Sequence, residues 1–494
     1  MGTVFSLTAT IFQQPIAEIS HVVGRKPAFL LVLAVFAAGS TVAAMADNMA
    51  TLLIGRSMQG FASGGTVLAA IVLTDLIELR DRATWLSVQN ATQALGLRWL
   101  FWINLPAIAA AAAGLGVLLG FDRPEDGVLR NLKKVDWMGI AIFMPSAVAL
   151  LVPFTMAGIF FSWRSWQAIM SLLLGIFGLT ALALHQRFVA KNPMFRASLF
   201  TNWATVFGFL GQAAFGVCVN MIFYYLVIYW SGVRGFSEIL TGVALLPETF
   251  AIPIAAIVCG LIMRQKNKIR WAMWVGWPLT SLSIGFLWFL DTKTPLPVLI
   301  LINAGVGLGA GTIASALNVS ILATTKREDN GHAMAMGWLF KSAGMCMGIA
   351  IGTAVFTVQM ERELEKIGGA DMTAQSFLRA LKEVKDDPTG REVIVNTLRI
   401  LWLICCVLSG TVGLLCCSVK YPPLYDPRQI AGAEGGSSGQ PIRVFTEKQS
   451  YHLSVGSMST TASSGRESSS GECTPSKGTS VKSESKRALF GCCR

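Results

Sequence analysis

Three ionisable side chains lie inside long apolar segments of this 494-residue chain. They are placed about six to ten residues from the start of their segments, with Arg56 in 50–74, Glu248 in 238–262 and Lys341 in 332–359. A charge held at that depth in a membrane is costly, so such residues mark an ion or substrate pathway or a paired network. Gln59 follows Arg56 by three residues, and both side chains can therefore face the same cavity.

Two interpretations of the acidic group and the lysine stay open. In the first, Glu248 titrates protons or attracts a cation. In the second, Glu248 and Lys341 form an ion pair between helices that only holds this part of the protein together. A structural role is also the alternative for Arg56, because buried charged groups are often paired for packing.

The elements that must position these residues are predicted to be membrane-spanning helices. Hydrophobic residues make up 53% of the chain and charged residues only 14%, with a mean hydropathy of +0.56. A run of about 20 helical residues crosses the hydrocarbon core of roughly 30 Å. About thirteen apolar segments of this kind predict an all-α, polytopic membrane protein. They cover residues 3–20, 28–46, 50–74, 83–97, 99–121, 137–157, 165–185, 203–230, 238–262, 271–290, 297–324, 332–359 and 398–419.

The loops between these segments alternate between basic and nearly uncharged, which predicts their sides of the membrane. The basic set is expected to be cytoplasmic and holds Arg25, Lys26, Arg80, Arg82, Arg123, Arg130, Lys133, Lys134, Arg187, Lys191, Arg196, Arg264, Lys266, Lys268, Arg270, Lys326 and Arg327. The intervening short loops hold only Arg98, Arg164, Arg234 and Lys293. The net charge of +12 therefore reflects topology, and nucleic acid is not an expected partner.

The remaining tryptophans and cysteines have positions that packing in a membrane explains. Trp230 is one of five tryptophans near expected outer helix ends, where it fits an aromatic belt or could stack on a planar substrate. Seven of the ten cysteines fall in apolar spans, with no zinc-ligand spacing. Nothing resembles a catalytic triad, a metal box or an ATP-binding cassette, so neither an enzyme nor a metal or cofactor is expected.

Several motifs resemble those of a known transporter family. The stretch Ala17–Lys26, with Gly24, Arg25 and Lys26 at its end, resembles the gating-loop signature between the second and third helices of the major facilitator superfamily. The family pattern has Gly and Asp where this chain has Ala17 and His21. The stretch Gly55–Gly60 is similar to the family's Arg-x-x-Gln-Gly motif of helix four, which implies a coupling role for its arginine. Further matches lie at Arg98–Pro106, Asp136–Gly139, Tyr229–Gly235, Leu245–Phe250 and Lys341–Gly344.

Over roughly residues 1–420, the resemblance points to the fourteen-helix drug:proton antiporter branch and to its fungal members. Two departures accompany it. The first family helix is expected to be absent, and the segment 83–97 is short, with the antiporter signature of helix five missing. The loop charges still favour two passes over 83–121. A gene-model error or exon loss is the alternative.

The expected architecture is a two-half helical bundle. The N-terminal half covers 1–121, a cytoplasmic loop 122–136, two linker helices 137–185, a second cytoplasmic loop 186–202, the C-terminal half 203–420 with an extracellular loop at 360–397, and a disordered cytoplasmic tail 421–494.

The leading hypothesis is a monomeric plasma-membrane transporter that exports a small amphipathic substrate in exchange for protons by alternating access. The alternatives are uptake of a nutrient or an iron chelate, and a truncated membrane protein that transports nothing.

Overall fold

The computed structural model describes residues 2–76, 84–86, 133, 135–156, 164–366 and 388–422, and these residues form helices and short connections without strands. The elements are α1 (Gly2–Val23), α2 (Arg25–Ala44), α3 (Met49–Gly64), α4 (Thr66–Leu76), α8 (Trp137–Met156), α9 (Trp166–Phe188), η1 (Ala197–Phe200), α10 (Trp203–Ile228), η2 (Tyr229–Val233), α11 (Glu238–Ala244), α12 (Leu246–Lys266), α13 (Arg270–Leu287), α14 (Leu296–Thr324), η3 (Arg327–Asp329), α15 (Asn330–Lys366) and α17 (Pro388–Ser418).

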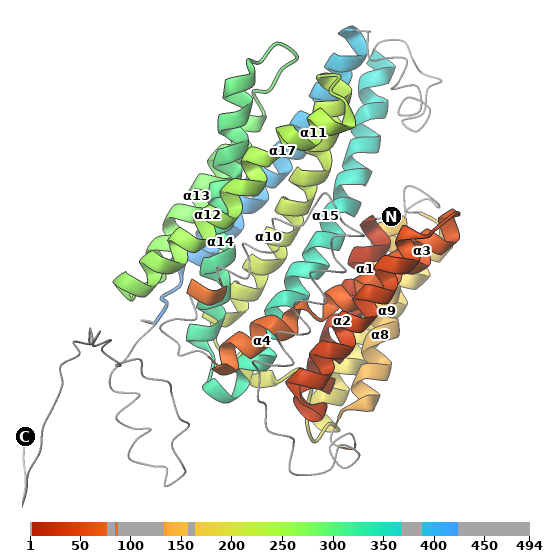
Figure 1. Cartoon of the computed structure of the whole chain (residues 1–494), viewed down its shortest axis with the longest axis vertical. Coiled ribbons are helices and arrows are strands. Elements are labelled where there is room, and N and C mark those ends of the chain that lie inside the picture. Colours follow the sequence, from red (N-terminus) through yellow and green to blue (C-terminus); the bar gives the residue numbers. More distant parts are fainter. Residues whose placement is uncertain are drawn as a thin grey trace, which may run out of the picture. The chain divides into compact units, whose positions relative to one another are not determined.

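The helices associate in three groups (Figure 1). The N-terminal bundle consists of α1 to α4, in which α3 packs on both α1 and α2. The α8–α9 hairpin packs on α1 and α15 through α8. The C-terminal bundle consists of α10 to α17, in which α10 packs on α14, α15 and α17 and α14 packs on α12 and α13. Helix α15 also contacts α1 and α4, so it joins the two bundles.

The basic connections gather at one end of the bundles, called the η3 end below. At this end, Gly331 at the start of α15 lies against His21 at the end of α1, and Arg196 before α10 pairs with Asp329. On α14, Gly307 lies against Glu248 of α12 and Ser315 donates to the carbonyl of Ala256 of α12, so the two helices run in the same direction. Since α14 ends at the η3 end, α12 also ends there, and so does the α12–α13 connection. The described basic residues of these connections include Arg25, Lys26, Arg187, Lys191, Arg196, Arg264, Lys266, Lys268, Arg270 and Lys326.

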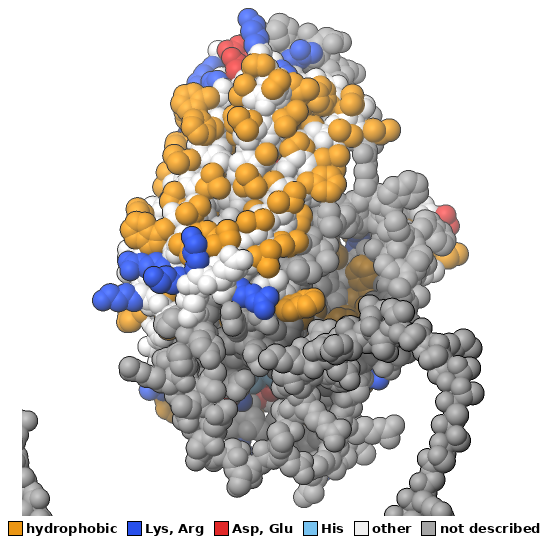
Figure 2. All heavy atoms as spheres, turned by 60° about the vertical axis from the view of Figure 1, so that its left-hand side comes forward, with side chains coloured by type: hydrophobic (Ala, Val, Ile, Leu, Met, Phe, Trp, Pro, Cys, Tyr) orange, Lys and Arg blue, Asp and Glu red, His pale blue; other side chains and the backbone are white. Residues whose placement is uncertain are grey.

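Large hydrophobic side chains face outward between the two charged ends. Figure 2 shows a broad hydrophobic surface with a group of Lys and Arg side chains below it and further charged side chains above it. Its exposed members on α12 to α14 include Phe250, Ile254, Val258, Trp274, Leu282, Phe286 and Leu301. An apolar belt bounded by charges is the surface that a lipid bilayer covers.

Every predicted apolar segment that falls on described residues is helical, and nine described helices have the length and composition of membrane spans. Two segments are interrupted where the apolar pattern continues. The segment 50–74 is divided at Gly65, and 238–262 is divided at Leu245, just before Pro247 in the first turn of α12. The proline lacks the backbone N–H and favours a helix start at this point.

The region expected as the loop 360–397 is partly helical. Helix α15 continues to Lys366, whose Nζ lies 2.6 Å from Oε1 of Glu363, and α17 begins at Pro388. Charged residues end the apolar pattern without ending the helix, because α-helix continues readily in water. The predicted segments 83–97, except for 84–86, and 99–121 lie outside the described residues, as do the loop 122–132, the part 367–387 and nearly all of the tail 421–494.

Several helix pairs touch backbone to backbone through glycine, among them two in the C-terminal bundle. A Cβ at Gly311 of α14 would collide with the carbonyl oxygen of Ile252 on α12, and one at Gly344 of α15 would collide with that of Ala213 on α10. Small residues at such crossings let membrane helices approach closely. The glycines of the segment 297–324 therefore serve packing.

Candidate functional site

The gating-loop residues form a turn that glycine makes possible. Gly24 separates α1 from α2 and has φ +105°, which residues with a Cβ rarely adopt. Arg25 then opens α2 and turns back, so that its Nη1 donates to Oγ of Ser20 at 2.7 Å and its Nη2 lies 2.8 Å from Nδ1 of His21. Lys26 follows on the same turn. The motif therefore holds its arginine against the end of α1.

This turn also connects the N-terminal bundle to the start of α15. The rings of His21 and His332 stack with centroids 4.7 Å apart and planes 9° apart. Nδ1 of His332 lies 3.9 Å from Oε2 of Glu18, which is 7% exposed. Together, Glu18, His21, Arg25 and His332 are called the η3-end cluster below. It joins the two bundles through polar side chains.

Asp329 supports the C-terminal side of this cluster. Its carboxylate accepts hydrogen bonds from Arg196 and from Oγ of Ser198, the latter at 2.7 Å. Burial is the largest single effect and would raise the pKa of Asp329, but the two hydrogen bonds together with the charge interactions with Arg196 and His332 hold the pKa below its usual value. Asp329 is therefore a fixed anion that holds the loop before α10 against the start of α15.

Glu18, His332, Asp329 and Arg196 were not predicted to lie together. Glu18 lies near the end of the predicted segment 3–20, so it did not meet the depth criterion that selected Glu248. The other three lie at helix ends or in connections, where charge is ordinary. Their proximity arises only when distant elements meet.

The α3 motif forms a short polar chain across the N-terminal bundle. Nη1 of Arg56 donates to Oε1 of Gln59 at 3.4 Å, and Nε2 of Gln59 donates to Oγ of Ser40 on α2 at 2.9 Å. Gln59 is 1% exposed and Arg56 is partly exposed. The predicted placement of both side chains on one helix face agrees with this contact. Arg56 lies in the second turn of α3, which begins at the end opposite to the η3 end.

Glu248 lies in the first turn of α12 and is 1% exposed. Its backbone carbonyl touches Gly307 of α14. Its Oε2 atom has no hydrogen-bond partner among the described residues, and neither amide atom of the buried Asn303, one helical turn before Gly307, has one. A buried carboxyl oxygen without a partner is costly, and a proton or a ligand would satisfy it.

Lys341 lies on α15, apart from Glu248 on α12. Its Nζ is 4.6 Å from the centroid of the Trp338 ring on its own helix and 5.6 Å from that of Phe215 on α10. The structure shows no ion pair between Lys341 and Glu248, nor between Lys341 and another described acidic residue. The alternative of a structural Glu248–Lys341 pair is therefore not what the helices form here.

Trp230 is fully buried within η2. Its ring stacks on Phe236 with centroids 5.3 Å apart and meets Tyr229 edge-on at 5.7 Å. A planar substrate would have to displace one of these neighbours. In this conformation the ring is part of the core of the C-terminal bundle.

The described residues contain no group of three His, Cys, Asp or Glu side chains that could hold a metal ion. The ionisable groups instead lie at separate places. Glu248 is in the first turn of α12 and Arg56 in the second turn of α3, and both helices begin at the end opposite to the η3 end. Lys341 is in the fourth turn of α15, which begins at the η3 end. This distribution suits a protein that binds and releases ions or solutes along a path.

The comparisons with known proteins fit this arrangement. The family profile described as Major Facilitator Superfamily matches residues 1–349. "MFS transporter L2" of a Phoma species is 32% identical over 436 residues, which cover 83% of this chain and 73% of the relative. "MFS efflux transporter aclA" of Aspergillus oryzae is 28% identical, covering 81% and 78%, and "Efflux pump FUS6" of Gibberella fujikuroi is 25% identical, covering 85% and 81%. The solved structure of the proton:xylose symporter XylE aligns at a TM-score of 0.46 and 13% identity over 84% of this chain and 83% of its own, a likeness too distant to carry more.

Proposed function

Because this chain belongs to the major facilitator superfamily, whose profile spans residues 1–349, we propose that it exports small amphipathic molecules in exchange for protons. Membership makes the chain a multi-pass secondary transporter and not an enzyme. The names of the relatives aclA and FUS6 describe efflux, which favours export as the direction for this chain. We also assign it to the plasma membrane, as a monomer.

The observation that carries proton coupling is the carboxyl group of Glu248. It lies in a predicted membrane span, is 1% exposed and has an oxygen atom without a partner among the described residues. A carboxyl group in such surroundings can take up a proton on one side and release it when its surroundings become polar. Arg56, bonded to Gln59 in the other bundle, is the second group assigned to coupling.

Alternating access then requires the η3 end to open and close. The sequence predicts this end to be cytoplasmic, because the basic connections lie there. In the conformation seen here, the η3-end cluster holds the bundles together across α1 and α15. Release of these contacts would admit substrate from the cytoplasm, and their formation would close that side.

The test uses the full chain in proteoliposomes with an imposed pH gradient. The probes are fluorescent dyes of similar size that are amphipathic and carry a positive, a negative or no charge. Export coupled to protons predicts that at least one dye moves against its gradient only when protons flow the opposite way. Movement of dye and protons in the same direction would favour uptake, and no gradient-driven movement of any dye would contradict the proposal.

A further inference from the structure

Lys341 is an ammonium group that the C-terminal bundle does not neutralise. Its side chain is partly exposed, and its Nζ lies over the rings of Trp338 and Phe215 at 4.6 and 5.6 Å from their centroids. Both distances are within the reach of cation–π attraction. None of the acidic residues that the structure describes pairs with it. A charge in a membrane span without a counter-ion is by default a candidate for a functional site.

The same place holds an unused hydrogen-bond donor. Trp338 is 6% exposed, and its Nε1–H has no partner among the residues described. The indole that carries this N–H is the ring beneath the ammonium of Lys341. An ammonium and an indole N–H are both donors and cannot satisfy each other. A ligand that satisfies them must bring acceptor atoms, and a negative charge would match the ammonium best.

These groups face the junction of the two bundles. Helix α15 meets α10 at Gly344 and Gly348, and it meets α1 at Cys346, whose Sγ lies 3.5 Å from Oγ1 of Thr10. At 3.6 residues per turn, Lys341 and Trp338 lie on the part of the α15 surface between the side that touches α10 and the side that touches α1. Neither therefore points toward lipid.

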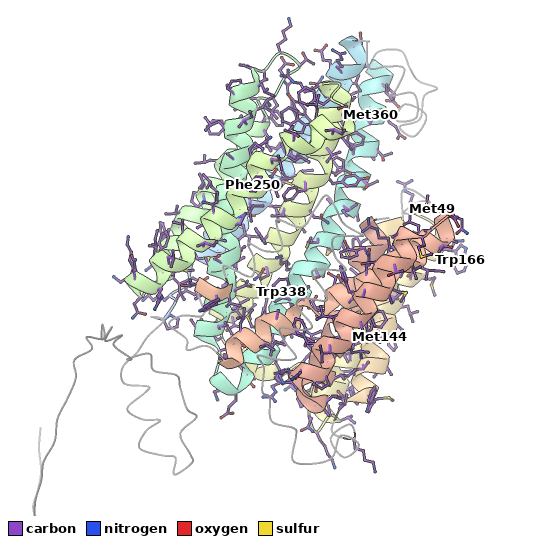
Figure 3. The ribbon with its side chains drawn as sticks, viewed as in Figure 1. Met49, Met144, Trp166, Phe250, Trp338 and Met360 are labelled. Atoms are coloured by element: carbon purple, nitrogen blue, oxygen red, sulfur yellow. The ribbon has the colours of Figure 1, made fainter. Side chains whose placement is uncertain are left out.

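Side chains from both bundles surround this position. Trp338, labelled in Figure 3, packs in one hydrophobic cluster with Ile16 of α1 and with Val67 and Ile71 of α4. Phe215 belongs to α10. Apolar surface from two bundles thus adjoins the two donors, which is the lining that an amphipathic molecule requires.

We propose that Lys341, Trp338 and Phe215 form a subsite that selects amphipathic carboxylates over amines and neutral analogues. The carboxylate accepts from Lys341 Nζ and Trp338 Nε1 when the bundles part, because the two rings beside the ammonium, Trp338 and Phe215, are buried in this conformation. An organic cation would meet an ammonium with no acidic neighbour and is disfavoured. This inference rests on the proposed function, because it names the class of substrate that the exporter takes.

The test measures binding to the full chain in lipid nanodiscs by equilibrium dialysis, with empty nanodiscs as the blank. The probes share one ring system and differ in the head group: 2-naphthoate, 2-naphthamide and 2-naphthylmethylamine. Wild type is expected to bind the carboxylate about tenfold more tightly than the amide, which is the effect of one charge-assisted hydrogen bond. Lys341→Gln should bind the two alike, while Lys341→Arg keeps the preference. Trp338→Phe should weaken carboxylate binding several-fold and leave amide binding nearly unchanged.

The matched control is Lys266→Gln, which removes another cation over a tryptophan ring, that of Trp271 at 5.7 Å, at the end of α12. It should keep the head-group preference. Equal binding of the three probes to wild type, tighter binding of the amine, or an unchanged preference in Lys341→Gln would overturn the inference. If Lys341→Gln does not fold, wild type and Trp338→Phe still decide. Dye export that continues without any carboxylate preference would refute the subsite alone, whereas carboxylate binding without gradient-driven transport would count against the proposed function alone.

Discussion

The imidazole of His21 at the end of α1 stacks on that of His332 at the start of α15, with ring centroids 4.7 Å apart. The two residues are 311 positions apart in the sequence and belong to different bundles. The family that the loop motif resembles has Asp where this chain has His21. The polar contact between the bundles is therefore made here by two aromatic rings with Glu18 and Arg25 beside them.

A cross-link at this contact should stop transport. In a chain whose other cysteines have been replaced, His21→Cys with His332→Cys should be joined by a short bifunctional thiol reagent, and a cleavable reagent should allow transport to recover. The reason is that alternating access must separate α1 from α15 at the η3 end. The control pair is Ser281→Cys with Ser409→Cys, whose hydroxyl oxygens lie 2.8 Å apart within the C-terminal bundle. Full transport with the first pair cross-linked would contradict the proposed opening.

Loss of the charge on Asp329 should weaken the η3 end at neutral pH. Asp329→Asn removes the charge from hydrogen bonds with Arg196 and Ser198, which should lower the free energy of unfolding by about 1–2 kcal/mol. The pKa of Asp329 is lower in the folded protein than its ordinary 3.8. Its stabilisation is therefore complete above the ordinary value and is lost as pH falls through the lowered one.

The difference in stability between wild type and Asp329→Asn should accordingly stay constant from about pH 5 to 8 and shrink only in strong acid. Thermal unfolding across this range measures it. Glu328→Gln is the matched control, because Glu328 is adjacent and exposed. An equal loss in both variants would show that Asp329 has no special role.

Glu248→Gln should separate coupling from structure. The substitution keeps the shape of the side chain, and the structure shows no ion pair that it would break. Expression should therefore stay close to that of wild type, while the dependence of transport on the pH gradient should disappear. Poor expression that Lys341→Met restores would instead reveal a structural pair in another conformation. Normal expression with unchanged pH dependence would remove Glu248 from the coupling mechanism.

The loop charges predict where inserted tags are reached. A tag in 264–270 or 189–195 should be cytoplasmic, and one in 291–294 or 367–387 should be extracellular, because the first two lie in basic connections. Protease protection in sealed vesicles measures this. Tags in 264–270 and 189–195 on opposite sides would contradict the shared position of these loops at the η3 end.

The apolar segments were predictable because twenty-residue hydrophobic runs are read directly from sequence. The interruptions at Gly65 and Leu245 were not, since apolar composition continues across both. The position of each residue along its helix was also predictable, whereas the partner of its side chain was not. Glu248 and Lys341 suggested a pair because both lie inside apolar spans, but the structure shows no ion pair between them, and Nζ of Lys341 lies over the rings of Trp338 and Phe215.

The contacts of the η3-end cluster lay beyond sequence analysis for a different reason. Glu18 and His21 come from α1 and His332 comes from α15, so their meeting depends on how the bundles dock. Arg25 was found because a local motif fixes its turn, with Gly24 at positive φ. Local geometry can be recovered from one sequence, but a contact between distant helix ends needs the packing itself.

The glycine crossings within the C-terminal bundle bear on how this protein moves. At Gly311 and Gly344 one helix rests on the peptide carbonyl of its neighbour, with no side chain between them. At such a contact no side chain can change its rotamer to let the two helices rotate or slide past each other. The motion must then take place where side chains separate the helices, as between α1 and α15, where Gln14 reaches only the sulfur of Met336, at 3.8 Å. The C-terminal bundle would thus move as a rigid body. The contact between α1 and α15, where flexible sulfur-containing side chains pack, would be the place where it shifts against the N-terminal bundle.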